Sequence, residues 1–285
     1  MPGRDTYLDG LLAEGFFLLK APRWHAGTLW MSDTAGRKVY CLDLDGKTRV
    51  VAEVPEGPFG LGFLTDGTPL VASILDRRIL RLKKDRLVCH ADLSQVTAGK
   101  LNDMIVDRLS RAYVCSFDFE ASAPECFKTA CVILITGKGK ARVVADNLAR
   151  PNGMAITGDR QLLVAETFGH RLTTFKISAD GSLLQRRLFA NFEQISPNGI
   201  CLDAEGAVWT AAAHQPLFVR VFQGGHINHR VHVPGRQAVA CQLGGPDGRT
   251  LFCLTLAKNL ENYPNRSATA RVETTLVDVP RAILD

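Results

Sequence analysis

Three asparagines recur in one local pattern and are the first residues in the chain whose type and spacing could serve chemistry. Asn102 stands in Leu101-Asn102-Asp103, whereas Asn152 and Asn198 each stand inside a Pro-Asn-Gly triplet. They are separated by about 50 and about 46 residues. Because an asparagine amide both donates and accepts hydrogen bonds, three amides gathered at one point can bind the oxygens of a small molecule. Asparagine is also a common turn residue, so a structural reading stays open for each one alone.

The asparagines belong to a longer unit that repeats along the chain. In each copy one apolar segment leads through a polar turn to a second apolar segment, and two further strand candidates follow. The clearest copies pair 59–67 with 70–73, 101–106 with 112–115, 151–156 with 162–165, and 197–202 with 208–211; degenerate first and sixth copies pair 22–24 with 29–33 and 239–243 with 251–253. This period, with four short strands per unit and no convincing amphipathic helix, predicts an all-β fold: a six-bladed β-propeller of four-stranded antiparallel blades, with residues 1–285 as one domain.

The expected fold explains how residues so far apart in sequence could act together. The first strand of each propeller blade lines the central channel, and the loops at one end of the channel form a pocket. Residues near the starts of these inner strands therefore converge on one axis. We expect six residues to occupy that place: Lys20, Gly60, Asn102, Asn152, Asn198 and Gln242. With Asp103 beside Asn102, the set combines an amine, a carboxylate and several amides, which favours a small-molecule site.

Composition excludes several other classes of function. The formal charge is only +5 over 285 residues, and Lys and Arg are scattered rather than clustered, which argues against a nucleic-acid partner. No apolar run approaches the ~20 residues that span a bilayer, so no membrane partner is expected. The first residues lack the apolar stretch of a signal peptide. The expected partner is a small-molecule substrate, and the oligomeric state is left open.

The eight cysteines indicate a reducing compartment. They are spread along the chain, mostly inside strand-like runs, and no C-x-x-C pair is present. This distribution is typical of buried, reduced thiols and does not indicate a zinc site. We therefore expect a cytoplasmic protein.

Read together, the repeated motifs resemble those of the SMP-30/gluconolactonase/LRE-like family. The resemblance runs from Gly15 to about Leu254. The motifs that carry it are Pro22-Arg23-Trp24, Leu29-Trp30-Met31-Ser32-Asp33, Leu101-Asn102-Asp103, Pro151-Asn152-Gly153-Met154, Ala165-Glu166-Thr167 and Pro197-Asn198-Gly199-Ile200-Cys201-Leu202-Asp203. The resemblance implies a six-bladed propeller that hydrolyses lactones with one divalent cation, held in the channel by a Glu, an Asn and an Asp.

The chain departs from that pattern at two of the three cation ligands. By the resemblance, Asn152 matches the metal-binding Asn. The family Glu, two residues before Pro-Arg-Trp, is Lys20, and the family Asp of Pro-Asp-Gly, which is also the catalytic base, is Asn198.

The resemblance also identifies residues near the substrate. It matches Asn102 and Asp103 to the family's Asn-Asp pair. An arginine that sugar-lactone members carry two residues before this pair is here Lys100.

These changes argue against a bound cation. Calcium prefers several oxygen ligands, usually including carboxylates, and Lys20 places a positive charge where the ion would lie. We therefore expect no cofactor. If a divalent cation bound nonetheless, its ligands would come from Asn152, Asn198 and Asp103.

Three readings of Lys20 remain open. In the first, Lys20 is an amine catalyst that forms a Schiff base with a carbonyl substrate or acts as a general base, as in lyase, aldolase or decarboxylation chemistry. Asp103 would then move protons, and Asn102, Asn152 and Asn198 would orient substrate oxygens. In the second, the enzyme is a lactone hydrolase in which Lys20 is the electrophile or a weakly bound metal acts. In the third, Lys20 fills the channel in a salt bridge with Asp103, and the propeller binds a ligand without catalysis.

Three further residues are weaker candidates for substrate contacts. His214 lies in the loop after a predicted inner strand pair, and Lys100 lies two residues before Asn102. Phe117 belongs to an irregular insertion, 116–128, in which Phe117 and Phe119 could form the apolar wall of a lid over the pocket. Glu166 is as consistent with a bond to the backbone as with a substrate contact.

Overall fold

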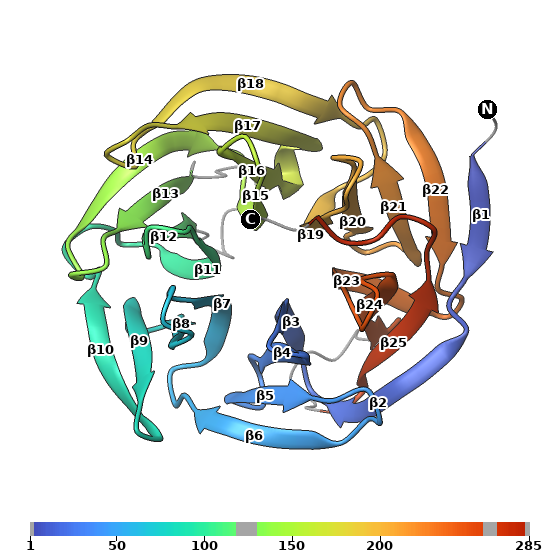
Figure 1. The fold of residues 1–285 in the computed structure, drawn as a ribbon, viewed down its shortest axis with the longest axis horizontal. Coiled ribbons are helices and arrows are strands. Elements are labelled where there is room, and N and C mark those ends of the chain that lie inside the picture. The colour runs from blue at the N-terminus through green and yellow to red at the C-terminus, as the bar shows by residue number, and fades with distance from the viewer. Residues whose placement is uncertain (1–2, 118–129, 259–266, 283–285) are drawn as a thin grey trace.

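The computed structural model describes residues 3–117, 130–258 and 267–282, in which six β-sheets surround a central channel (Figure 1). The expected six-bladed propeller is confirmed. In the described part of the chain the helical structure is a single 3-10 turn, η1 (Thr167–Gly169). No helix among the described residues is long and apolar enough to cross a membrane.

The first three blades each contain four consecutive antiparallel strands, and the innermost strand comes first in sequence. Blade 1 consists of β3 (Leu19–His25), β4 (Thr28–Asp33), β5 (Lys38–Leu42) and β6 (Thr48–Glu53). Blade 2 consists of β7 (Pro58–Phe63), β8 (Pro69–Ser73), β9 (Arg78–Lys83) and β10 (Arg86–Asp92). Blade 3 consists of β11 (Lys100–Val106), β12 (Ala112–Phe117), β13 (Ala130–Ile135) and β14 (Ala141–Leu148).

The last three blades include both ends of the chain. Blade 4 consists of β15 (Pro151–Ile156), β16 (Gln161–Glu166), β17 (Arg171–Ile177) and β18 (Leu183–Asn191). Blade 5 consists of β19 (Pro197–Leu202), β20 (Val208–Ala212), β21 (Leu217–Val221) and β22 (Ile227–His232), with β1 (Arg4–Tyr7) at its edge. Blade 6 consists of β23 (Arg236–Gly244), β24 (Thr250–Ala257), β25 (Ala270–Leu276) and β2 (Gly10–Phe16).

The N-terminal strands close the ring. Strand β2 pairs antiparallel with β25, so blade 6 takes its outermost strand from the start of the chain. Strand β1 pairs in parallel with β22 and gives blade 5 a fifth strand, which the repeat pattern did not predict. Because β2 leads directly into β3 of blade 1, its pairing with β25 joins the first blade to the last.

The blades are held together by apolar side chains packed between adjacent sheets. The largest fully buried side chains include Trp209, Tyr113, Phe218 and Phe252. Cys201, Cys241 and Cys253 are buried in one of these apolar clusters and are free thiols, as the sequence predicted.

A bulge interrupts the pairing of every inner strand at the same place. In blades 4 and 5 the pairing skips Asn152-Gly153 and Asn198-Gly199, and in blade 3 it skips Asn102-Asp103. A Cβ on Gly153 would lie 2.5 Å from the carbonyl oxygen of Asn198, and one on Gly199 would lie 2.3 Å from the Cβ of Ala240. Glycine follows asparagine here because neighbouring inner strands approach too closely for a side chain.

The end of the described chain covers one mouth of the channel. The Ala282 amide donates to the carbonyl of Leu202 in blade 5, and the Arg281 amide donates to that of Gly248 in blade 6. Arg281 and Ala282 line the cavity at this end of the channel. The asparagine bulges lie at the other end.

Candidate functional site

A narrow cleft lies between the inner strands at the end of the channel where these strands begin. Four of the predicted site residues line it: Lys20, Asp103, Asn152 and Asn198. The volume open to the centres of water molecules is about 10 Å³, which suits about one water. Only a water or a substrate oxygen can therefore enter between these side chains, and the body of a substrate must lie at the mouth of the channel.

Blades 2 and 6 contribute apolar side chains to the cleft, contrary to the sequence prediction. Phe59, rather than Gly60, faces it from blade 2, and Val239 faces it from blade 6. Gln242 lies beyond the bulge of β23, lines the cavity at the far end, and donates to the carbonyl of Leu243. The prediction was wrong because the bulge of each strand, which fixes the side chain that turns into the channel, was not located.

Lys20 is partly buried on β3, immediately before the bulge of blade 1. Its Nζ lies 5.7 Å from the centre of the Phe59 ring. The pKa of the amine is lowered from 10.5 to about 8, mainly by burial and also by repulsion from Arg150, while attraction to Asp103 partly opposes both effects. A fraction of the amine is therefore neutral near neutral pH.

Asp103 is not paired with Lys20 in the described part of the chain. Its Oδ1 accepts from the Arg23 guanidinium at 2.7 Å and from the Met104 amide at 2.8 Å. The salt bridge between Lys20 and Asp103, which the non-catalytic reading proposed, is replaced by the pair with Arg23.

Arg23 forms the floor of the cleft and was missed as a site residue by sequence reasoning. Its guanidinium also donates to the backbone carbonyls of Pro22, Leu61 and Met104, which belong to blades 1, 2 and 3. Arg23 lines both this cleft and the cavity at the far end of the channel. A buried arginine with these acceptors separates the two cavities and neutralises Asp103.

Asn152 and Asn198 form one hydrogen-bonded pair. Asn152 Nδ2 donates to Asn198 Oδ1 and, at 3.4 Å, to the Thr167 hydroxyl. The same hydroxyl donates to the carbonyl of Pro197 at 2.8 Å. Because Asn198 Oδ1 is the acceptor, its NH2 group is the end of the side chain that can donate to a substrate oxygen.

The structure places the other predicted residues around the cleft rather than in it. Asn102 is buried and donates to the carbonyl of Pro151 at 2.8 Å, which ties blade 3 to blade 4. Lys100 is exposed at the start of β11, and His214 is exposed in the turn between β20 and β21 with a φ of 62°. Phe117 is partly buried at the end of β12, whereas Phe119 and the rest of the proposed lid, 118–128, lie outside the described residues.

Glu166 is a buried structural residue of blade 4. Its carboxylate accepts from the Ala149 amide at 2.7 Å, from Arg171 and Arg186, and from the Thr173 hydroxyl. Burial alone would raise the pKa of Glu166, but these hydrogen bonds outweigh burial and lower it. The carboxylate fixes the turn that leads into β15.

Arg150, in that turn, is the second residue that sequence reasoning missed. It is partly buried, has a φ of 56°, and precedes Asn152 by two positions. The centre of its guanidinium lies 5.2 Å from the Phe117 ring and 4.7 Å from the Phe168 ring. The only sequence signal was a basic residue immediately before Pro-Asn-Gly.

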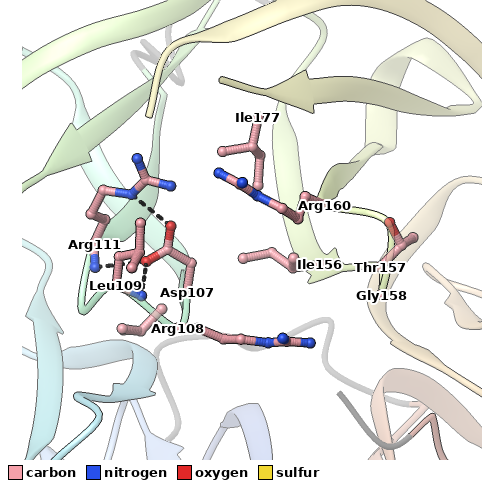
Figure 2. A pocket seen from close by; sticks show the side chains of 10 residues that line it. Asp107, Arg108, Leu109, Arg111, Ile156, Thr157, Gly158, Arg160 and Ile177 are labelled. Atoms are coloured by element: carbon pink, nitrogen blue, oxygen red, sulfur yellow. Dashed lines mark hydrogen bonds and ion pairs between the residues drawn. The ribbon is translucent and has the colours of Figure 1, made fainter. Parts of the chain in front are cut away.

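A larger cavity of about 240 Å³ lies at the other end of the inner strands, between blades 3 and 4 (Figure 2). Figure 2 shows Asp107 and Arg111 paired with each other on one side of it and Ile156 and Ile177 on the other. The Thr157 hydroxyl donates a hydrogen bond to the carboxylate of Asp159. We place the candidate site at the cleft, because there the amine and amide groups face open space.

The comparisons with known proteins agree with this fold. Residues 18–257 match the model of the family described as SMP-30/Gluconolactonase/LRE-like region. Pentonolactonase XacC from Haloferax volcanii is 23% identical over 160 residues, which are 55% of this chain and 53% of that protein. The match therefore spans about half of the relative's length.

Solved structures share the whole fold. A luciferin-regenerating enzyme superposes with a TM-score of 0.81 at 19% identity, covering 94% of each chain. Regucalcin from Agrobacterium tumefaciens, described as a calcium-binding protein, gives 0.79 at 21% identity, covering 99% of this chain and 100% of that one. A gluconolactonase from Xanthomonas campestris superposes with a TM-score of 0.74 at 22% identity, covering 94% of this chain and 89% of that one. At these identities the likeness concerns the fold.

Proposed function

Because the chain belongs to the SMP-30/gluconolactonase/LRE-like family, we propose that it hydrolyses a lactone or a comparable small cyclic ester in the cleft around Lys20. The pentonolactonase and gluconolactonase among its relatives support hydrolysis. They do not support the lysine-dependent lyase chemistry that the sequence alone placed first. The lactonase reading therefore takes precedence.

The observation that carries the proposal is the position of the Lys20 amine beside the Asn152–Asn198 pair. In a relative with a cation, the metal would polarise the substrate carbonyl. Here the Lys20 ammonium takes that role and, with the Asn198 NH2 group, stabilises the negative charge that develops on the carbonyl oxygen. The cleft has room for about one water, which serves as the nucleophile, and the carbonyl oxygen approaches Lys20 and Asn198 from the channel mouth.

Asp103 takes the role of base. Since Oδ1 is held by Arg23 and Met104, Oδ2 orients and deprotonates the attacking water. The water oxygen bonds to the carbonyl carbon, the ring C–O bond breaks, and the leaving oxygen takes the proton back from Asp103. The product is the open-chain hydroxy acid.

The donor set of the cleft does not fit a divalent cation, and we propose that the enzyme works without one. Asp103 is the acidic side chain that lines the cleft, and its charge is neutralised by Arg23. Asn198 Oδ1 already accepts a hydrogen bond from Asn152. Adding two positive charges beside the Lys20 amine would be unfavourable, because each like-charge pair raises the electrostatic energy.

A pH profile of hydrolysis tests this assignment. Purified full-length protein is assayed with γ- and δ-lactones of sugar acids in the presence of EDTA, and proton release is followed with an indicator. Since the ammonium is the active form, kcat/KM should fall as the pH rises through about 8, the pKa of Lys20. Lys20→Met should lose about 100- to 1,000-fold in kcat, the typical effect of removing one oxyanion-stabilising group. Lys176→Met, at an exposed position of β17 in blade 4, is the matched control and should stay near wild type.

A second candidate function is amine catalysis by Lys20, favoured by the lowered pKa of its amine. In that case a ketone or keto acid condenses with the neutral amine and releases water, and borohydride reduces the resulting imine to a stable adduct. Incubation with borohydride and a panel of aldehydes and keto acids should then add the substrate mass, less one oxygen atom, to Lys20. Activity would rise, not fall, as the pH passes through about 8.

We also place the protein in a reducing compartment such as the cytoplasm. Seven cysteines in the described ranges are free: Cys41, Cys89, Cys115, Cys131, Cys201, Cys241 and Cys253. Free thiols, most of them buried, support a cytoplasmic location, because disulfides form in oxidising compartments.

A further inference from the structure

Arg160 occupies a turn position at which three other blades carry glycine. In blades 2, 5 and 6 the turn between the first two strands places Gly67, Gly206 and Gly248 at φ values of 78°, 76° and 74°. The same position is Ser110 in blade 3 and Arg160, with a φ of 63°, in blade 4. Left-handed backbone is unfavourable for a residue with a side chain, and such strain is found most often at functional sites. The arginine at this position therefore calls for a reason beyond the turn itself.

The Arg160 side chain extends from the turn into the cavity of about 240 Å³ between blades 3 and 4, toward the side where Asp107 and Arg111 lie (Figure 2). Arg108 lines the same cavity. Among the residues that the structure describes, the guanidinium groups of Arg108 and Arg160 have no ion pair and no hydrogen bond. Two arginine side chains at this cavity are thus available to a ligand.

The carboxylates around the cavity are already bonded. Asp107 accepts two backbone amides through Oδ1, and its Oδ2 accepts from Arg111 Nε at 2.7 Å. Asp159, next to Arg160, accepts from two side chains of its own turn and does not line the cavity. The side chains that line the cavity include three arginines and one carboxylate, so their formal charge is +2. This charge attracts an anion.

The other wall of the cavity is apolar. Ile156 and Ile177 form it on the side of blade 4 (Figure 2), and Val106 joins them from blade 3. A bare ion would leave these side chains without a partner. The combination of an apolar wall with a few charged groups is typical of sites for small organic molecules.

We propose that this cavity is a second ligand site, which binds a small organic anion. Its carboxylate or phosphate group pairs with the Arg160 guanidinium, which matches either group in shape and charge. Arg108 adds to the attraction, and the apolar body of the ligand packs against Ile156 and Ile177. Because the cavity lies at the opposite end of the inner strands from Lys20, the ligand binds whether or not the cleft hydrolyses lactones.

Calorimetric titration of the full-length protein at fixed ionic strength tests the proposal. The probes are 3-phenylpropionate, phenyl phosphate and the neutral 3-phenylpropionamide. Wild-type protein should bind at least one of the two anions about 10- to 100-fold more tightly than the amide, the typical effect of a charge-assisted hydrogen bond. The tighter anion identifies the head group. Acetate and inorganic phosphate, which lack the apolar body, should bind at least about 10-fold more weakly.

Two variants of Arg160 separate binding from folding. Arg160→Gly restores the residue of the other blades, so it should melt at or above the wild-type temperature and lose the preference for the anion. Arg160→Gln removes the charge and should lose the preference too. Arg187→Gln, at an exposed position of β18 in the same blade, is the matched control and should keep it.

Lys20→Met distinguishes this cavity from the cleft, and it should bind the anion as tightly as wild type does. Loss of binding in Lys20→Met would place the anion in the cleft and overturn the proposal. Equal affinities of wild-type protein for the anions and the amide would overturn it as well, and so would an anion preference that persists in both Arg160 variants.

Discussion

Replacing Lys20 by methionine should stabilise the protein while it removes activity. Methionine keeps the length and apolar stem of the side chain but removes the charge. The pKa of Lys20 falls from 10.5 to about 8 mainly because the amine is buried. At 1.36 kcal/mol per pKa unit, holding the ammonium in the cleft costs about 3 kcal/mol. Methionine loses the cation–π contact with Phe59. The variant should therefore recover only about 1–3 kcal/mol of this cost at pH 7.

The pH dependence gives this prediction its sign. Below pH 8 the lysine is protonated in both the folded and the unfolded chain, so the full penalty applies. Between about 8 and 10.5 the unfolded chain binds the proton and the folded chain does not, so wild-type stability rises with pH. The advantage of Lys20→Met should therefore be largest at pH 7 and nearly absent at pH 10.5.

Thermal melting at several pH values measures the effect without any substrate. A gain of 1–3 kcal/mol corresponds to a rise in melting temperature of about 2–8 °C for a protein of this size. The same substitution at the exposed Lys100 should change the melting temperature by less than about 1 °C at every pH. The reasoning would be refuted if Lys20→Met melted at or below the wild-type temperature at pH 7, or if its advantage did not change with pH.

Three further predictions concern the frame of the site. Gly153→Ala should destabilise the fold by about 1–3 kcal/mol in urea titrations, since its Cβ would lie 2.5 Å from the Asn198 oxygen, whereas Gly158→Ala, with nothing within 4 Å, should be near neutral. Glu166→Gln should have a lower melting temperature than wild type at pH 7. The difference should shrink as the pH falls, because the lowered pKa of Glu166 stabilises the fold only while the carboxylate is ionised. An equal difference in melting temperature at pH 7 and pH 3 would contradict this. EDTA, Ca²⁺, Mn²⁺ and Zn²⁺ should leave the melting temperature unchanged, whereas a cation at 100 times its dissociation constant would add about 2.7 kcal/mol.

Much of the fold could be predicted because its signals are local and repeated. Asn102, Asn152 and Asn198 recur at the blade period, and each lies near the start of an inner strand, as their shared pattern indicated; the bulge that holds each of them was not predicted. The glycines at 153 and 199 follow from the close approach of neighbouring inner strands. The fifth strand of blade 5 was not predictable, since β1 pairs in parallel with a strand more than 200 residues away.

Part of the site could not be predicted, because its contacts cross between blades. Asp103 was expected beside Lys20, but the Arg23 side chain reaches it from blade 1 and bonds to three backbone carbonyls on the way. Arg150 had no repeat signal, and its contacts with the rings of Phe117 and Phe168 join residues 33 and 18 positions away in the sequence.

The sequence by itself therefore determined the number of blades and the family, because repeat period and residue identity need no coordinates. It also predicted, from the resemblance alone, that Lys20 and Asn198 stand where relatives carry cation-binding carboxylates. Only the tertiary structure decided which side chains face one another. The bulges place Phe59 and Val239, not Gly60 and Gln242, at the cleft. Burial at the channel axis lowers the pKa of Lys20, and the closed ring brings Arg150 within its electrostatic reach. Such effects depend on through-space distances between blades, which strand periodicity does not encode.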